Sequence, residues 1–186
     1  MSGYEKRDTM LTIIMGPMFS GKTNTLLDFE QEFASRDMKV SIVKYKLDTR
    51  YTDAAVIKTH DGRVNSGKAN VCMSMKLSDV DADIANADVV LIDEGQFFND
   101  LHAFCKRWIG SKTIVVSCLN GDFRQEPFKP IVEILGMADE ILYKKSTCTK
   151  CGKTAPFTVR TIASEEQTLI GADDIYQPRC RACLSV

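Results

Sequence analysis

The amino-acid sequence predicts an α/β fold, with a parallel β-sheet covered by helices and a small cysteine-rich lobe after it in the chain. Three observations predict this fold: apolar runs that recur between helix-like stretches, a glycine-rich loop between one such run and a helix, and two C-x-x-C pairs near the end. A chain of 186 residues can form one substantial core and leaves room for only a small appendage. We expect a flexible arm at residues 1–9, an α/β domain at 10–146 and the lobe at 147–186.

Five apolar runs predict the strands of the sheet: residues 10–15, 39–45, 88–94, 112–121 and 139–145. Their Val, Ile and Leu residues follow one another without alternation, which suits strands buried on both faces of a parallel sheet. Leu26, Phe29 and Phe33 recur at helical spacing and predict a crossover helix over 23–38. Residues 50–70 instead predict a protruding, mobile hairpin, because Asp61-Gly62 suits a two-residue turn.

Composition and charge argue against several classes of partner. The chain has 24 basic and 25 acidic residues, a net charge of −1 and no evident basic patch, so we expect no nucleic-acid and no membrane partner. The opening residues are polar, and the apolar stretch at 11–19 is too short and too interrupted by Gly and Pro for a signal core or a membrane span. We therefore expect a cytoplasmic protein.

The stretch "GPMFSGKT" at residues 16–23 fits the pattern G-x-x-x-x-G-K-[ST], with an apolar run before it and a helical stretch after it. Backbone N–H groups released by Gly16 and Gly21 would cradle phosphate oxygens, and Lys22 would add positive charge. Thr23 would offer its hydroxyl to Mg²⁺. A chance glycine-rich turn is the alternative. The bulky Met18 and Phe19 either pack in the core or face a flat apolar ligand.

Two adjacent acids, Asp93 and Glu94, follow the apolar run at 88–92. Such a run delivers a carboxylate to the sheet edge where ligands bind in open α/β folds, so Asp93 is predicted to hold Mg²⁺. Side chains alternate along a strand, so Glu94 points elsewhere. It is a candidate for the base that takes a proton from an acceptor hydroxyl, or for the water-activating acid of an ATPase.

The pairs Cys148-x-x-Cys151 and Cys180-x-x-Cys183 predict a closed, structural four-sulfur zinc site, with free thiols or disulfides as the alternative. Zinc would pin both ends of a long loop at residues 157–178 within the 28 intervening residues, and such loops are usually functional. Tyr176, near one pinned end, would cover a ligand or pack on the lobe. The other three thiols, Cys72, Cys105 and Cys118, are interpreted as small buried hydrophobes or bystanders.

These motifs together, with "KYKLDTRY", "LNGDFRQEPF" and "YQPRCRAC", resemble the zinc-containing, tetrameric type of the thymidine kinase family from about residue 10 to residue 183. The resemblance implies transfer of the ATP γ-phosphate to the 5′-hydroxyl of thymidine, with Mg²⁺, in nucleotide salvage. It makes Glu94 the catalytic base. It also implies feedback inhibition by thymidine triphosphate and a homotetramer.

The resemblance also implies the binding residues. Those of ATP are Gly16, Pro17, Met18, Phe19, Ser20, Gly21, Lys22, Thr23, Asp48, Thr49, Arg50, Asp93 and Gln96. Those of thymidine are Met18, Phe97, Leu119, Phe123, Thr158, Gln167, Thr168, Leu169, Ile170, Gly171 and Tyr176. Residues 167–171 match a loop, called the lasso in this family, whose backbone hydrogen-bonds the base. We expect Arg50 to bind the transferred phosphoryl group through two hydrogen bonds.

The sequence departs from the family pattern at two places: "LIGADD" stands where many relatives carry a double glycine, and Asn120 stands where many carry Asp. Both departures concern loop detail and inhibitor sensitivity. A nucleic-acid-dependent ATPase of RecA-like architecture with a zinc ribbon is the alternative function, since a parallel sheet, a phosphate cradle and adjacent acids fit it too. It predicts a basic track with interleaved aromatic residues, which the acidic stretch at 160–175 does not offer.

Overall fold

The structure, a computed structural model, describes residues 9–48, 56–59, 61–169, 171 and 174–184. A six-stranded parallel sheet forms its centre, in the order β3-β2-β4-β5-β1-β6. The strands are β1 (Leu11–Gly16), β2 (Val40–Tyr45), β3 (Asn70–Ser74), β4 (Val89–Ile92), β5 (Thr113–Leu119) and β6 (Glu140–Tyr143). The predicted α/β class is confirmed, and all five predicted runs form strands of this sheet.

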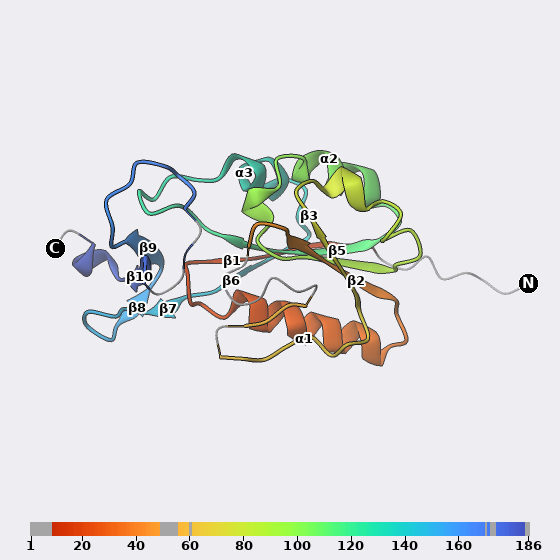
Figure 1. Cartoon of the computed structure of the whole chain (residues 1–186), viewed down its shortest axis with the longest axis horizontal. Coiled ribbons are helices and arrows are strands. Elements are labelled where there is room, and N and C mark those ends of the chain that lie inside the picture. The colour runs from red at the N-terminus through yellow and green to blue at the C-terminus, as the bar shows by residue number, and fades with distance from the viewer. Residues whose placement is uncertain (1–8, 49–55, 60, 170, 172–173, 185–186) are drawn as a thin grey trace, which may run out of the picture.

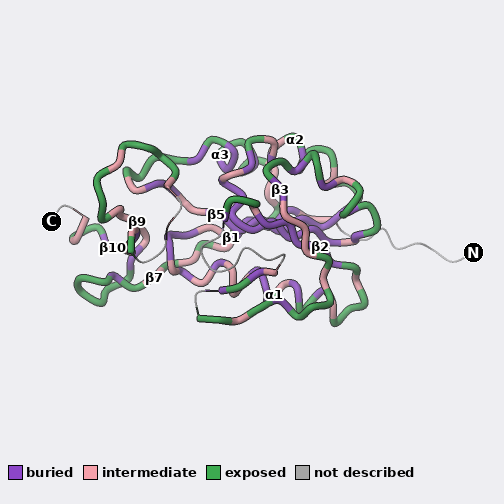
Figure 2. Tube along the Cα trace, viewed as in Figure 1, coloured by how far each residue is buried: buried purple, intermediate pink, exposed green. Residues whose placement is uncertain are grey.

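Helices cover both faces of the sheet (Figure 1). On one face lies α1 (Lys22–Ser35), whose Leu26, Leu27 and Phe33 pack against residues of β1, β2, β4 and β5. On the other face lie α2 (Leu101–Trp108) and α3 (Lys129–Leu135), with the short 3-10 helices η1 (Leu77–Val80) and η2 (Gly95–Phe97). The central strands are buried on both sides (Figure 2), which explains their unbroken apolar sequence.

The sequence analysis missed β3 and misplaced the segment before it. Residues 57–65 do pair antiparallel, through a Lys58–Val64 bridge and a turn in which Gly62 has φ 88°. This hairpin lies against α1 instead of protruding: Arg63 pairs with Asp28, and the buried Glu30 accepts hydrogen bonds from the backbone and hydroxyl of Ser66. The prediction of a protruding hairpin is therefore wrong for the described residues, because polar groups on α1 and an inward Ile57 hold it down.

The C-terminal lobe consists of two small antiparallel pairs, β7 (Ser146–Thr147) with β8 (Thr154–Ala155), and β9 (Phe157–Arg160) with β10 (Tyr176–Arg179), followed by the 3-10 helix η3 (Arg181–Cys183). Figure 1 shows this lobe at the left of the view, beyond one end of the sheet. Hydrogen bonds join it to the carboxyl end of the sheet: Thr158 bonds to the backbone of Met18, and Asn120 bonds to the backbone of Pro156. The division of the chain at residues 146 and 147 stays a prediction.

Among the helices of the described residues, none combines the length and the apolar character that a membrane crossing requires.

Candidate active site

The predicted phosphate loop connects the carboxyl end of β1 to the amino end of α1. Gly16 ends β1 where a side chain would collide with the backbone oxygen of Lys144, 2.5 Å from an added Cβ, so only glycine fits. Gly21 precedes α1 with φ 76°, and Phe19 also has a left-handed backbone with φ 59°. The strand, the loop and the helix N-terminus together favour a built anion site over a chance turn.

A cavity of about 240 Å³ lies over this loop and is lined by Met18, Phe19, Ser20, Gly21, Lys22, Thr23, Asn24, Thr59, Asp61 and Glu94. Lys22 is buried, and its ammonium group donates to the backbone oxygen of Pro17 at 2.7 Å. The Ser20 hydroxyl donates to the same oxygen at 2.8 Å, so both side chains hold the loop in its bent form. Thr59 and Asp61, which belong to the hairpin, also line this cavity.

Asp93 follows β4 directly and is buried. Its Oδ1 accepts a hydrogen bond from the Ser117 hydroxyl on the neighbouring strand β5, which fixes the carboxylate. A second cavity of about 20 Å³ brings Asp93 together with Thr23, Lys44, Asp48, Ile57, Lys58 and Glu94. A space of this size holds about one water molecule or ion, and its hydroxyl and carboxylate groups are ligands that Mg²⁺ prefers.

Glu94 has the left-handed backbone conformation, with φ 55° and ψ 48°. This conformation costs a non-glycine residue about 1–3 kcal/mol and is concentrated at functional sites. Gly95 follows because a Cβ there would lie 2.4 Å from the Val116 side chain of β5. Because Glu94 leaves the extended conformation, the alternation of side chains along a strand does not apply to it, and both Asp93 and Glu94 line the cavity of about 20 Å³.

Gln96 connects Glu94 to the end of β5. Its amide nitrogen donates to Oε2 of Glu94, and its amide oxygen accepts from the backbone N–H of Leu119 at 3.0 Å. Gln96 is buried and lines none of the three cavities at this edge of the sheet that the described residues form. The predicted nucleotide-binding residue is thus placed where it orients the candidate base.

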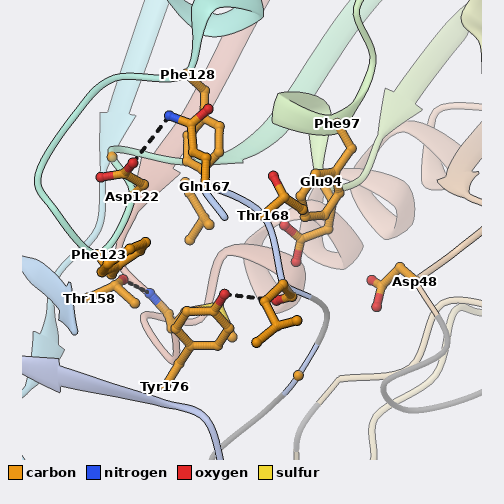
Figure 3. Close-up of a pocket in the computed structure, with 15 residues that line it drawn as sticks. Asp48, Glu94, Phe97, Asp122, Phe123, Phe128, Thr158, Gln167, Thr168 and Tyr176 are labelled. Carbon is orange, nitrogen blue, oxygen red and sulfur yellow. Dashed lines mark hydrogen bonds between the residues drawn. The ribbon is translucent and has the colours of Figure 1, made fainter. Parts of the chain in front are cut away.

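A third, largely apolar pocket lies between the sheet edge and the lobe, and Figure 3 shows the side chains around it. Every predicted thymidine-binding residue within the described chain lines it: Met18, Phe97, Leu119, Phe123, Thr158, Gln167, Thr168, Leu169, Gly171 and Tyr176. Met18 therefore faces a ligand space, whereas Phe19 lines only the cavity over the glycine-rich loop. The predicted residues Thr49, Arg50 and Ile170 lie outside the described residues.

Sequence reasoning missed several residues of the site. Asp122 and Phe128 line the apolar pocket, and the buried Asp122 accepts from the Gln167 amide at 3.2 Å (Figure 3). Lys44 is buried in β2 and lines the cavity of about 20 Å³. A lysine inside a mostly apolar strand was a usable signal for it. Nothing local marks Asp122, because its partner Gln167 lies 45 residues away in sequence.

Glu94 lines all three cavities: the cavity over the glycine-rich loop, the cavity of about 20 Å³ beside Asp93 and the apolar pocket. Asp48 lines two of them, the cavity beside Asp93 and the apolar pocket. A carboxylate at this junction can accept a proton from a group bound in the apolar pocket while that group faces a phosphate.

The four predicted zinc ligands converge in the lobe, where the sulfur atoms of Cys148, Cys151, Cys180 and Cys183 lie within 4.8 Å of one another. Those of Cys151 and Cys180 are 3.5 Å apart. Four sulfurs around Zn²⁺ at about 2.3 Å form a tetrahedron with edges of about 3.8 Å, so the cluster fits this metal. The fit favours zinc over two disulfides.

Electrostatics of the cluster also call for a cation. Desolvation opposes ionisation of the Cys148 thiol, but backbone hydrogen bonds from Cys180, Lys150 and Cys151 outweigh it and lower its pKa to about 6. Hydrogen bonds with the Cys180 and Cys151 thiols raise the pKa of Cys183 to about 12. The Cys183 thiol therefore stays protonated at neutral pH unless a bound cation compensates its charge.

The remaining three cysteines fit the interpretation as small hydrophobic residues, since Cys105 and Cys118 are buried and Cys72 is partly buried. Burial raises the pKa of the Cys105 and Cys118 thiols to about 12, and burial with the nearby Asp83 raises that of Cys72 to about 11. All three thiols stay protonated at neutral pH and behave as small hydrophobic groups.

Comparison with known proteins decides the family. The sequence profile described as "Thymidine kinase" matches residues 9–184. The chain belongs to the thymidine kinase family. It is 34% identical to "Thymidine kinase, cytosolic" of Gallus gallus, over 93% of this chain and 75% of that one. It is 34% identical to "Thymidine kinase" of Myxoma virus, over 92% and 93%, and 35% identical to "Thymidine kinase 1" of Dictyostelium discoideum, over 93% and 76%.

Outside the thymidine kinase family, the fold is similar to that of the flagellar accessory protein FlaH from Methanocaldococcus jannaschii. Its crystal structure superposes with a TM-score of 0.50 over 78% of this chain and 74% of its own, at 18% sequence identity. This likeness concerns the fold alone. Within the family, the departure at Asn120 has a structural counterpart, because its amide donates to the Tyr143 hydroxyl at 3.1 Å and to the Pro156 carbonyl at 3.0 Å.

Proposed function

We propose that this chain transfers the γ-phosphoryl group of ATP to the 5′-hydroxyl of thymidine, giving thymidine monophosphate and ADP. The position of Glu94 carries the proposal: its carboxylate lines the cavity over the glycine-rich loop, the cavity beside Asp93 and the apolar pocket at once. A base for phosphoryl transfer to an alcohol is needed between the bound alcohol and the phosphate. Membership of the thymidine kinase family supports the same substrate pair.

In the proposed reaction, Glu94 accepts the proton of the 5′-hydroxyl as that oxygen forms a bond to the γ-phosphorus. The bond between the γ-phosphorus and the bridging oxygen breaks, and ADP leaves with the electron pair. Backbone N–H groups of the loop at 16–23 and the Lys22 ammonium bind the phosphate oxygens. Thr23 and Asp93 would hold Mg²⁺, which supplies positive charge against the charge that develops on the phosphates.

The apolar pocket is proposed to bind the nucleoside. Met18, Phe97, Leu119, Phe123 and Tyr176 offer flat or flexible apolar surfaces to a pyrimidine ring. The Oγ1 atom of Thr158 already accepts from the Met18 backbone at 2.9 Å, which ties this wall to the phosphate loop. The backbone of residues 167–171 would hydrogen-bond the base.

Three further proposals follow from the family resemblance. Thymidine triphosphate would inhibit by placing its base in the apolar pocket and its phosphates in the cradle that ATP uses, because the two cavities share Met18 and Glu94. Cytoplasmic assembly into a homotetramer is proposed as well, and the exposed Val132 and Leu135 of α3 and Ile141 and Tyr143 of β6 offer apolar surface for it. Structural Zn²⁺ would occupy the four-cysteine cluster.

The comparisons with known proteins do not favour a nucleic-acid-dependent ATPase. The loop beside the pocket exposes the acidic residues Glu165 and Glu166, and Asp174 is also exposed. These charges would repel a phosphate backbone.

The test is ADP release by the zinc-loaded protein with ATP and Mg²⁺, measured with thymidine, with other deoxynucleosides, with no nucleoside and with single-stranded DNA. We expect release that depends on thymidine and yields its 5′-monophosphate in equal amount. Release that depends on DNA alone would refute the proposal. The same assay with added thymidine triphosphate is expected to show inhibition that excess ATP and thymidine together relieve.

A further inference from the structure

Arg160 stands at the end of β9, two residues after Thr158, and the sequence analysis gave it no role. Its side chain reaches the loop that leads toward Gly171. One guanidinium nitrogen donates to the backbone oxygens of Ser164 at 3.1 Å and Glu166 at 2.6 Å. The other donates to the backbone oxygen of Gln167 at 3.1 Å and to the Tyr176 hydroxyl at 2.8 Å. A single side chain thus ties three loop carbonyls to β10.

The same guanidinium stacks on a wall of the apolar pocket. Its central carbon lies 3.9 Å from the ring centroid of Phe123, well within the range of a favourable cation–π contact. Arg124 lies over Phe123 as well, at 5.1 Å, and donates to the backbone oxygen of Glu165 at 3.3 Å. Arg160 therefore joins the loop to Phe123. Phe123 and residues 167–169 of the loop line the proposed nucleoside pocket.

Nearly all backbone oxygens of this loop accept a hydrogen bond from a side chain. Arg160, Arg124 and Tyr176 donate to the carbonyls of Ser164, Glu165, Glu166, Gln167 and Leu169. Within the described chain, the backbone N–H groups of residues 164–169 donate to no other residue. The backbone carbonyls of the loop consequently hold it in place, while its backbone N–H groups remain available to a ligand. Such N–H groups suit a nucleobase that presents carbonyl oxygens.

We propose that Arg160 is a positioning residue for the nucleoside, which acts through the loop at 164–169 and through Phe123. The inference rests on the proposed function, in which this loop binds the base of thymidine. If the loop already has its binding conformation, the nucleoside does not have to order it. Less conformational entropy is then lost on binding, and the affinity for the nucleoside is higher. Arginine suits the task because its planar fork of donors is rigid, whereas lysine is a point charge on a flexible stem.

The test compares Arg160→Lys with the matched control Arg107→Lys, an exposed arginine that pairs with Asp81 away from the pocket. The measurements are kcat, the KM for thymidine, the KM for ATP, and hydrogen exchange of the amides of residues 161–169. For Arg160→Lys we expect faster exchange in this loop and a KM for thymidine raised about tenfold, equivalent to about 1.4 kcal/mol. The KM for ATP and kcat should stay within about twofold, and the control should match the wild type.

Tyr176→Phe provides a second, milder variant, since it removes only the hydroxyl that connects Arg160 with the Leu169 carbonyl. It should raise the KM for thymidine by a smaller factor. In the double variant the two effects should be less than multiplicative, because both substitutions weaken one network. If Arg160→Lys does not fold, Tyr176→Phe still tests the proposal by the same readouts.

Unchanged loop exchange in both variants would overturn the inference, because the loop would then not depend on this network. Faster exchange with an unchanged KM for thymidine would also overturn it, because the loop would then not position the nucleoside. Failure of the wild type to phosphorylate thymidine would refute the proposed function instead, and this outcome is seen before any variant is made.

Discussion

At the scale of the residue, the candidate base is held by its own backbone and by one neighbour. Glu94 has a left-handed conformation, and Gln96 bridges its carboxylate to the backbone N–H of Leu119. The motif "DEGQFF" made Glu94 a candidate base from the sequence, and the family resemblance favoured this role over that of an ATPase acid. It was not enough to assign Gln96, whose second partner is 23 residues away and is brought to it by the packing of η2 on β5.

Gln96→Leu removes both hydrogen bonds with little change in volume. We expect kcat for thymidine phosphorylation to fall about 10–100-fold, a part of the 10²–10⁴-fold that general-base catalysis typically contributes. ATP affinity should change little, because Gln96 lines none of the described cavities around the phosphate loop. Steady-state kinetics and equilibrium binding of ATP make the comparison.

Gln31→Leu, on an exposed position of α1, is the matched control and should behave as the wild type. A large loss of ATP affinity in Gln96→Leu, with kcat preserved at saturating substrate, would contradict this role. It would show that Gln96 binds the nucleotide, as the family resemblance implies.

At the scale of the element, the inner strands of the sheet and α1 were predictable because burial on both faces leaves mostly apolar runs and a helix leaves an apolar stripe. β3 was not, because it is an edge strand in which only Ser74 is buried, and its sequence, "NVCMS", has no such run. The hairpin at 57–65 was predicted to pair but not to dock. Its contacts with α1 depend on polar partners some 35 residues apart, such as Arg63 with Asp28.

Asn120 joins β5 to β6 and to the lobe, and Asn120→Asp tests this junction. A carboxylate cannot donate to the Pro156 carbonyl and would repel it, so we expect a loss of about 1–3 kcal/mol in the free energy of unfolding, the cost of an unmade hydrogen bond. Thermal unfolding of the zinc-loaded protein measures the loss as a lower Tm.

The control for that substitution is Asn99→Asp, an exposed asparagine before α2 that carries the same change in charge. Equal Tm values for the two variants would show that the Asn120 amide does not hold the lobe to the sheet.

At the scale of the whole molecule, the sheet and the lobe each supply part of the candidate active site. The sheet edge supplies the phosphate loop, Asp93 and Glu94, whereas the lobe supplies Thr158, Tyr176 and the loop at 164–169. The two C-x-x-C pairs predicted the cluster, and the long spacer predicted a functional loop. Contacts between lobe and sheet, such as Thr158 with Met18 across 140 residues, could not be predicted from spacing.

Removal of zinc by a chelator should therefore abolish thymidine phosphorylation, because Thr158, Tyr176 and the loop between β9 and β10 form one side of the pocket and depend on the cluster. Far-ultraviolet circular dichroism should keep most of its signal, since the sheet has its own core. Cys151→Ser should lose metal and activity, while Cys72→Ser, outside the cluster, should keep both. Full activity after confirmed metal loss would contradict this division of roles.

The central claim is that Glu94 takes the proton of the thymidine hydroxyl, and Glu94→Gln tests it most directly. The substituted amide keeps the size of the side chain and an oxygen for the Gln96 donor, but it is not a base. The decisive measurement is kcat for thymidine phosphorylation beside the equilibrium affinities for ATP and thymidine. We predict a fall in kcat of about 10²–10⁴-fold with both affinities retained. Turnover close to that of the wild type would contradict the claim.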